Sequence, residues 1–213
     1  MPWDRNQMAE RAAQELEDGM YVNLGIGIPT LVANYVGDKD ITLQSENGML
    51  GMGPFPVAGE EDPDLINAGK QTISEIPETS YFSSADSFAM IRGGHVDIAV
   101  LGSHQVSAKG DLANWMLPER GVGNVGGAMD LTAGARRVIA ALEHNDRGGQ
   151  AKVVKECSYP LTGRECVSLI VTDIAVEWIV ERALVLREVA SVWTVVKFQR
   201  ETLARLNIAH DLR

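Results

Sequence analysis

One glutamate, Glu46, has the setting that most clearly suggests covalent chemistry. It stands in the stretch LQSENGMLGMGP (residues 43–54), where an apolar strand is predicted to end. The Asn-Gly pair that follows favours a tight turn that leaves the carboxylate open to approach, and the apolar residues after it could exclude water. A carboxylate there could attack an acyl group or be attacked by one. The alternative is a solvated strand-end carboxylate, or a partner for a nearby helix terminus.

Two adjacent glycines, Gly126 and Gly127, could supply a complementary oxyanion site. They lie in VGNVGGAMDL, just before a predicted helix, where backbone N–H groups point outward and favour negative charge. The alternative is that these glycines only allow a sharp turn. Lys70, in LINAGKQT, could pair with phosphates as a point charge or be an ordinary surface lysine.

The histidines and cysteines form no catalytic or metal-binding pattern that we recognise. His95 and His104 lie nearest the predicted strand ends, but the chain has no Ser-His-Asp order and no HExxH spacing. Cys157 and Cys166 lack the CxxC or Cys/His grouping of a zinc site, so we predict no metal ion. We expect both thiols to be reduced packing groups, with a disulfide left open as the alternative.

The elements that must position these residues alternate between strands and helices. Helices are predicted over 4–18, 29–37, 85–94 and 194–206, and strands over 20–25, 41–46, 96–102, 136–144 and 167–176. Ser84 and Thr194 are the expected caps of the last two helices, and residues 47–63 are predicted to be a long loop. This order predicts an α/β fold: a three-layer open sheet, largely parallel, with helices on both faces.

The sheet would bring the candidate residues to one edge. Ligands of open α/β sheets collect outside the carboxyl ends of strands, and the turns GIGIP, ENGMLGMG and GSHQVSAKGD each follow a predicted strand. The GIGIP turn lacks the third glycine of a dinucleotide fingerprint, so it does not indicate NAD. The length of 213 residues favours a single domain over 1–213.

The composition excludes several functional classes. The formal net charge is −10, which opposes a nucleic-acid surface because phosphate binding needs clustered Lys and Arg. No apolar run approaches the roughly 20 residues of a membrane span, and the N-terminal residues contain no signal-peptide core. We therefore predict a cytoplasmic protein that meets anionic ligands through local donors.

Six stretches, taken together and in this order, resemble the B (beta) subunit of family I coenzyme A transferases. They are NLGIGIP, LQSENGMLGMGP, DLINAGKQT, GDLANWMLP, GGAMDL and CSYPLTG. The resemblance runs from about Met8 to Ala190 and is closest to the succinyl-CoA:3-ketoacid and 3-oxoadipate members of the family. It adds to the α/β prediction a specific chemistry for the strand-end glutamate.

The resemblance implies that Glu46 attacks an acyl-CoA to give an acyl-glutamyl anhydride and then a glutamyl-CoA thioester. It implies that Gly127, with Gly126, donates a backbone N–H group to the oxyanion. A carboxylate is already ionised near neutral pH, so it needs no adjacent base to act as a nucleophile. The absence of a triad is then expected.

The resemblance also implies the ligands and the partner. Lys70 matches a lysine that helps to hold coenzyme A, and Asn23 and Gln105 match recurrent pocket positions. Coenzyme A is the expected co-substrate, with no tightly bound cofactor, and a separate A subunit would complete a heterodimer or heterotetramer. The expected reaction passes CoA from succinyl-CoA to a 3-oxo acid such as acetoacetate.

Three alternatives stay open at this stage. The chain could be an acyl-CoA hydrolase on the same scaffold, a transferase with 3-oxoadipate or butyrate–acetoacetate specificity, or a non-catalytic ligand-binding module. Two departures from the family pattern bear on the choice. Gly123 and Asn124 stand where many relatives have a lysine and a glycine, and the hydrophobic tail from Glu177 onward, with Trp178 and Trp193, could pack against a partner.

Overall fold

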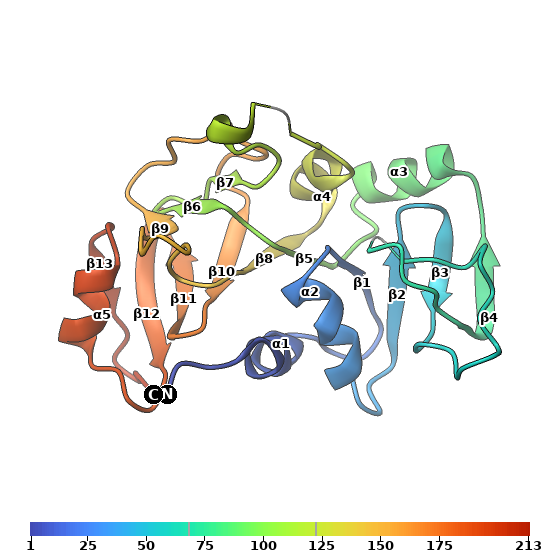
Figure 1. Cartoon of the computed structure of the whole chain (residues 1–213), viewed down its shortest axis with the longest axis horizontal. Coiled ribbons are helices and arrows are strands. Elements are labelled where there is room, and N and C mark those ends of the chain that lie inside the picture. Colours follow the sequence, from blue (N-terminus) through green and yellow to red (C-terminus); the bar gives the residue numbers. More distant parts are fainter. Residues whose placement is uncertain (68, 122) are drawn as a thin grey trace.

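A ten-stranded mixed sheet runs through the whole protein (Figure 1). The computed structural model describes residues 1–67, 69–121 and 123–213, which leaves out Ala68 and Val122. The sheet order is β13-β12-β11-β10-β8-β5-β1-β2-β3-β4. Its strands are β1 (Met20–Leu24), β2 (Ile41–Ser45), β3 (Met49–Met52), β4 (Glu75–Tyr81), β5 (Ile98–Leu101), β8 (Arg137–Ala141), β10 (Val167–Val171), β11 (Ala175–Val180), β12 (Ala183–Val189) and β13 (Leu206–Ile208).

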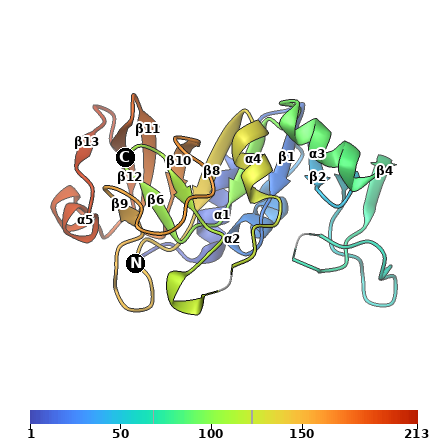
Figure 2. The same ribbon diagram turned by 90° about the horizontal axis from the view of Figure 1, so that it is seen from above.

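The centre of the sheet is parallel and its two flanks are mainly antiparallel. Strands β2, β1, β5, β8 and β10 pair in parallel, whereas β3 and β4 extend one side and β11 and β12 the other by antiparallel pairing. β13 returns parallel to β12 at one edge. Figure 2 shows β4 at the opposite end of the molecule from β13. The predicted α/β class is confirmed.

Helices cover both faces of the sheet. The helices are α1 (Arg5–Ala13), α2 (Ile28–Leu31), α3 (Ser84–Arg92), α4 (Ala128–Gly134) and α5 (Val195–Glu201), with 3-10 turns η1 (Val32–Tyr35) and η2 (Pro118–Arg120). α1, α2 and η1 pack on one face, and α3 and α4 pack on the other. A small sheet of β6 (Gln105–Ser107), β7 (Leu112–Ala113) and β9 (Val153–Val154) shares the second face.

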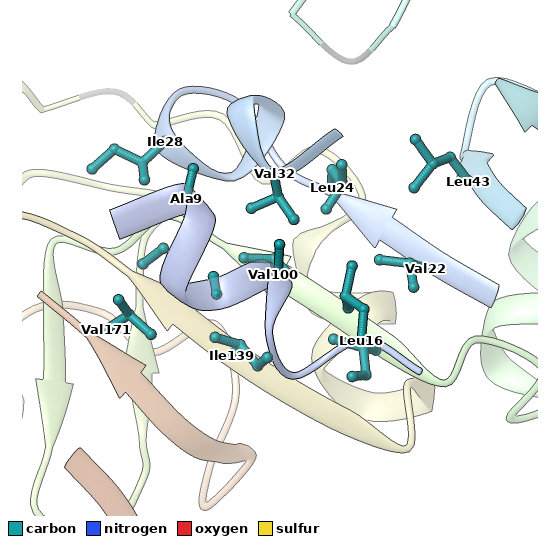
Figure 3. Close-up of a cluster of buried hydrophobic side chains, with 14 of the residues drawn as sticks. Ala9, Leu16, Val22, Leu24, Ile28, Val32, Leu43, Val100, Ile139 and Val171 are labelled. Carbon is teal, nitrogen blue, oxygen red and sulfur yellow. The ribbon is translucent and has the colours of Figure 1, made fainter. Parts of the chain in front are cut away.

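Strand β5 shows why the central strands consist of consecutive apolar residues. Ile98 and Val100 belong to the cluster under α1, while Ala99 and Leu101 belong to the cluster under α3 and α4. A strand buried on both faces gains by being apolar at every position, at roughly 1.5 to 3 kcal/mol for each fully buried large aliphatic side chain. Figure 3 shows the first cluster, in which Val100 lies among side chains of α1, η1 and β8.

The first helix begins where predicted and ends early. Asp4 caps it, since the backbone N–H of Gln7 donates to Asp4 Oδ1 at 2.8 Å and the Gln7 side chain accepts from the Asp4 backbone. The predicted end at Asp18 is wrong, because α1 stops at Ala13. The ammonium of Lys39 donates to the backbone oxygens of Ala13 and Leu16, and this contact stabilises the end of the helix.

Other boundaries differ because several strands were not expected. Residues 47–63 were predicted to be a loop, yet β3 lies within them, and β4 and β12 were not predicted. The helix predicted over 194–206 ends at Glu201, and Leu206 begins β13, which pairs parallel to β12. The predicted strand 167–176 is a hairpin that turns at Thr172, whose hydroxyl accepts from the N–H groups of Ile174 and Ala175. Ser83 rather than Ser84 caps α3, whereas Thr194 caps α5 as predicted.

Part of the hydrophobic tail packs against its own chain, while Val180, Val192, Val196, Leu203 and Ile208 are exposed. Trp178 lies between the guanidinium groups of Arg137 and Arg187, at 5.7 and 5.4 Å from the ring centre. Lys197 lies over Trp193 at 4.1 Å, and Phe198 of α5 is fully buried. None of the helices in the described ranges is long and apolar enough to cross a membrane. The assignment of residues 1–213 to one domain stays a prediction.

Candidate active site

A cavity of about 510 Å³ opens at the carboxyl ends of β1, β2, β5 and β8. Glu46, the turn Gly25–Ile28 and the segment Gly102–His104 all line it, so the three strand-end turns share one rim as predicted. Gly126 and Gly127 line it from the start of α4. The residues that the sequence singles out for covalent chemistry therefore meet in one cavity.

Glu46 follows the last residue of β2 and lies in the tight turn before β3. The backbone N–H of Gly48 donates to the Ser45 oxygen at 3.1 Å, which closes the turn. Gly48 has a φ of +124°, and a β-carbon there would stand only 2.1 Å from the backbone oxygen of Phe82. Glycine is therefore required at this position, and it lets β3 return beside β2 with Ser45 opposite Met49.

One carboxylate oxygen of Glu46 is held and the other is free. The side-chain amide of Asn23, on the neighbouring strand β1, donates to Glu46 Oε2 at 3.1 Å. Asn23 is 1% exposed, so this donor is not shared with solvent. Within the described residues, Glu46 Oε1 accepts no hydrogen bond. The half-buried carboxylate thus has a fixed orientation and one oxygen available for attack.

Gly127 packs directly against the glutamate. It occupies the cap position of α4 with φ −88°, and a β-carbon built on it would stand 3.5 Å from Glu46 Cγ and 3.2 Å from the Phe88 ring. The N–H of Gly126 donates to Asn124 Oδ1 at 3.2 Å, whereas that of Gly127 has no acceptor among the residues that the structure describes. Of the two predicted oxyanion donors, Gly127 is the free one.

Asn124, one of the departures from the family pattern, therefore has a local role. Its side chain occupies the Gly126 N–H, and its own backbone N–H donates to Trp115 O at 2.9 Å. The preceding Gly123 lies so close to Trp115 that a β-carbon would stand 2.2 Å from the same oxygen. A lysine at position 123 would need a different path of this segment.

Two of the predicted coenzyme-binding residues lie away from Glu46. Gln105 Oε1 accepts from the N–H groups of Ser158 and Tyr159, at 2.8 and 3.2 Å, and the residue lines a different cavity. Lys70 is exposed in a turn with φ +60° and is absent from the lining of the Glu46 cavity. The structure brings together Glu46, Asn23, Gly126 and Gly127 but neither of these two residues.

Other cavity residues were not singled out from the sequence. Arg5 and Lys152 line the same cavity, and Arg5 donates to Glu143 at 3.0 Å. His104, noted for its place near a strand end, also lines it, and burial together with the charges of Lys152 and Arg120 lowers its pKa below the ordinary value. In residues 1–67, 69–121 and 123–213 no three His, Cys, Asp or Glu side chains are grouped to hold a metal ion.

Comparison with known proteins decides the family. Residues 5–195 match the family described as Coenzyme A transferase. The chain belongs to the coenzyme A transferase family. It is 51% identical over 209 residues to the B subunit of the probable succinyl-CoA:3-ketoacid coenzyme A transferase of Bacillus subtilis (strain 168), covering 98% of this chain and 97% of the relative. The family predicted from the six sequence stretches is confirmed.

A second relative agrees with this membership, and a solved structure has the same fold. The chain is 60% identical over 173 residues to the B subunit of the 3-oxoadipate CoA-transferase of Pseudomonas putida. The aligned residues cover 81% of this chain and 81% of the relative. The apoenzyme of the acyl-CoA transferase YdiF from Escherichia coli O157:H7 has the same fold, with a TM-score of 0.79 and 20% identity. The structural alignment covers 100% of the present coenzyme A transferase chain and 43% of the YdiF chain.

Proposed function

We propose that this chain is the catalytic B subunit of an enzyme that moves CoA reversibly between succinyl-CoA and a 3-oxo acid such as acetoacetate. Coenzyme A is the co-substrate, no cofactor is tightly bound, and a separate A subunit completes the enzyme as a heterodimer or heterotetramer in the cytoplasm. The names of the relatives support the substrate class and the partner. The held and the free oxygen of Glu46 support the chemistry.

The reaction proceeds through two covalent states of Glu46. Oε1 attacks the thioester carbon of the acyl-CoA, and the C–S bond breaks to release the CoA thiolate and leave an acyl-glutamyl anhydride. The thiolate then attacks Glu46 Cδ, and the Cδ–Oε1 bond breaks to release the donor acid. A glutamyl-CoA thioester remains. The acceptor acid reverses these steps, so no water, oxidant or reductant is consumed.

The arrangement assigns separate tasks to Asn23 and Gly127. Oε2 stays on Cδ in both covalent states and carries the negative charge when the thiolate adds to Cδ. The Asn23 amide, already 3.1 Å away, is a preorganised donor to that oxygen. The free N–H of Gly127, beside Glu46 Cγ, is available to a second developing oxyanion. The position of Asn23 beside Oε2 supports the first of these roles, and the unoccupied Gly127 N–H among the described residues supports the second.

The coenzyme-binding roles of Lys70 and Gln105 stay proposals that rest on the resemblance alone. Lys70 is exposed and outside the cavity, so any contact would be to a part of coenzyme A that projects beyond the reacting thioester. Gln105 would have to release the turn at Ser158 and Tyr159 to reach a ligand. Asn23, in contrast, needs no rearrangement.

Trapping the covalent state tests the proposal. The complex with the A subunit is incubated with succinyl-CoA and no acceptor, digested, and examined by mass spectrometry. The peptide that contains Glu46 should carry coenzyme A in thioester linkage, and a Glu46→Gln complex should carry none and lose nearly all turnover. Steady release of free CoA without an adduct would instead support a hydrolase. Unchanged turnover in Glu46→Gln would support a non-catalytic module.

A second specificity has its own support. The relative at 60% identity is named for 3-oxoadipate, so 3-oxoadipate is the leading alternative acceptor. Rates with acetoacetate, 3-oxoadipate and butyrate, each with succinyl-CoA as donor, separate these specificities. The highest kcat/KM identifies the acceptor class.

A further inference from the structure

We infer that Gln44 and Ser87 are positioning residues for the reaction, which act on Glu46 through Asn23. The inference rests on the proposed function, because it concerns how the nucleophile of that reaction is held. The two residues lie on different elements, Gln44 on β2 and Ser87 on α3. Neither residue touches the free oxygen of Glu46, so neither is itself the nucleophile or an oxyanion donor.

A buried chain of side-chain hydrogen bonds connects α3 to the nucleophile. The Gln44 amide nitrogen donates to Ser87 Oγ at 2.8 Å, and the Asn23 amide nitrogen donates to Gln44 Oε1 at 2.8 Å and to Glu46 Oε2 at 3.1 Å. Ser87, Gln44 and Asn23 are 0%, 3% and 1% exposed. Water therefore cannot replace the link between Ser87 and Gln44 or that between Gln44 and Asn23 without opening the core.

The chemistry of the groups fixes the direction of every link. An ionised carboxylate only accepts hydrogen bonds, so Asn23 must turn its NH₂ group toward Glu46. That same NH₂ group faces Gln44, which must therefore present its oxygen to Asn23 and its nitrogen to Ser87. If Gln44 turned over, two NH₂ groups would face each other. The Ser87 hydroxyl, which can donate or accept, accepts from the Gln44 nitrogen in this orientation, and the orientation itself is set by Asn23.

The sheet and the helix hold the two ends of this chain in register. Asn23 and Gln44 are direct partners in the parallel pairing of β1 with β2, so their side chains leave the sheet side by side. The next residue of α3, Phe88, lies against Gly127. One turn of α3 therefore contacts both the support of the carboxylate and the glycine of the oxyanion site.

Single-turnover kinetics of the complex with the A subunit test the inference. The measured quantity is the rate constant for forming the CoA adduct on Glu46, with its half-saturating succinyl-CoA concentration. We expect Gln44→Leu to lower the rate constant about 10- to 100-fold, because small misplacements of reacting groups cost rates of this order. Ser87→Ala, a smaller truncation that preserves folding, should lower it about threefold to tenfold. Half-saturation should change little.

Double mutants that combine each substitution with Asn23→Ala distinguish a positioning role from a merely structural one. If both residues act through Asn23, Gln44→Leu and Ser87→Ala should cause no further loss of rate in an Asn23→Ala background. Losses that simply multiply would overturn the inference. Ser107→Ala is the matched control, because Ser107 is also fully buried and hydrogen-bonded, to Asp111, in another sheet. It should leave the rate constant unchanged.

The outcomes separate the inference from the function on which it rests. Suppose that the wild-type complex forms the adduct and that the Gln44→Leu and Ser87→Ala complexes form it at the same rate. This result would overturn the positioning role alone. A wild-type complex that turns over without any adduct would overturn the proposed function and the inference together. A slower adduct in both variants, at unchanged melting temperature for Ser87→Ala, supports both.

Discussion

Gly127 lies against Glu46 so closely that a β-carbon built on the glycine would stand 3.5 Å from Cγ of the glutamate. The two residues approach from different elements, since Glu46 follows the end of β2 and Gly127 caps the start of α4. A β-carbon at position 127 would stand at ordinary contact distance from Glu46 and closer to the Phe88 ring, at 3.2 Å.

We predict that Gly127→Ala lowers kcat about 100-fold while the melting temperature stays within a few degrees of wild type. The backbone angle of −88° suits alanine, so the fold should tolerate it, but the new methyl group would press on Phe88 at 3.2 Å and shift that ring, which lies next to Ser87 on α3. Gly148→Ala, in an exposed turn where only the Asp146 side chain is near, is the control and should keep full activity. Full activity in Gly127→Ala would contradict the proposed geometry.

Removing the side-chain amide of Asn23 should lower kcat much more than it changes KM. Asn23→Ala deletes the donor to Glu46 Oε2, and loss of one preorganised oxyanion donor typically costs about 100- to 1,000-fold in kcat. Asn23→Asp keeps the shape but faces Glu46 with a like charge, so its loss should be larger. Steady-state kinetics of the reconstituted complex provide the measurement. A loss confined to KM would mean that Asn23 only binds substrate.

Glu177 makes the stability of the folded protein fall as the pH rises from acidic values to about 8. Burial raises the pKa of this carboxyl to about 8, and neither of its oxygens has a partner among the residues described. The ordinary value in the unfolded chain is 4.5, so between these two values the folded state binds the extra proton and stability falls as pH rises. Above pH 8 the full loss is present.

We therefore expect Glu177→Leu to raise the melting temperature, by roughly 5 to 10 °C at pH 8.5 and by less at pH 6. Glu156→Leu, at an exposed position, is the control and should show no such dependence on pH. Thermal unfolding of the two variants and wild type across pH 5 to 9 provides the comparison. An equal gain at every pH would show that packing, not the charge, is responsible.

The two cysteines should react slowly in the native protein. Burial is the main cause that raises the pKa of Cys157 to about 12 and that of Cys166 to about 11, so little thiolate forms at neutral pH. We predict that a thiol reagent at pH 8 modifies both cysteines slowly in the folded protein. In denaturant it should modify both of them rapidly. Rapid stoichiometric modification of the native chain would contradict the raised pKa values of these half-buried thiols.

Much of the site could be predicted from the sequence because local chemistry determines it. The Asn-Gly turn after a strand placed Glu46 at a sheet edge, and the glycine pair before a helix placed Gly127 at the facing rim. Both statements depend only on short-range signals. The family followed from several such stretches in a fixed order, and the comparisons confirm it.

The rest depends on which strands lie side by side. From the sequence, Gln44 is an ordinary strand residue. Its role depends on the pairing of β1 with β2, which places Asn23 opposite it. Ser87 gains its role only because α3 packs over that pair. The strands β4 and β13 escaped prediction because exposed or short edge strands carry little apolar pattern of their own. The contact of Arg5 with Glu143 has no local signal either, because the two residues lie far apart in the sequence.

The tight turn after β2 also limits how this protein could acquire a new acyl preference. Because Gly48 has no room for a side chain beneath Phe82, almost any change within the turn would shift the start of α3 along with the nucleophile. In the opposite wall, His104 and the exposed Val125 already carry side chains that line the cavity. Directed evolution of substrate range should therefore succeed through mutations in that wall and leave the glutamate turn unaltered.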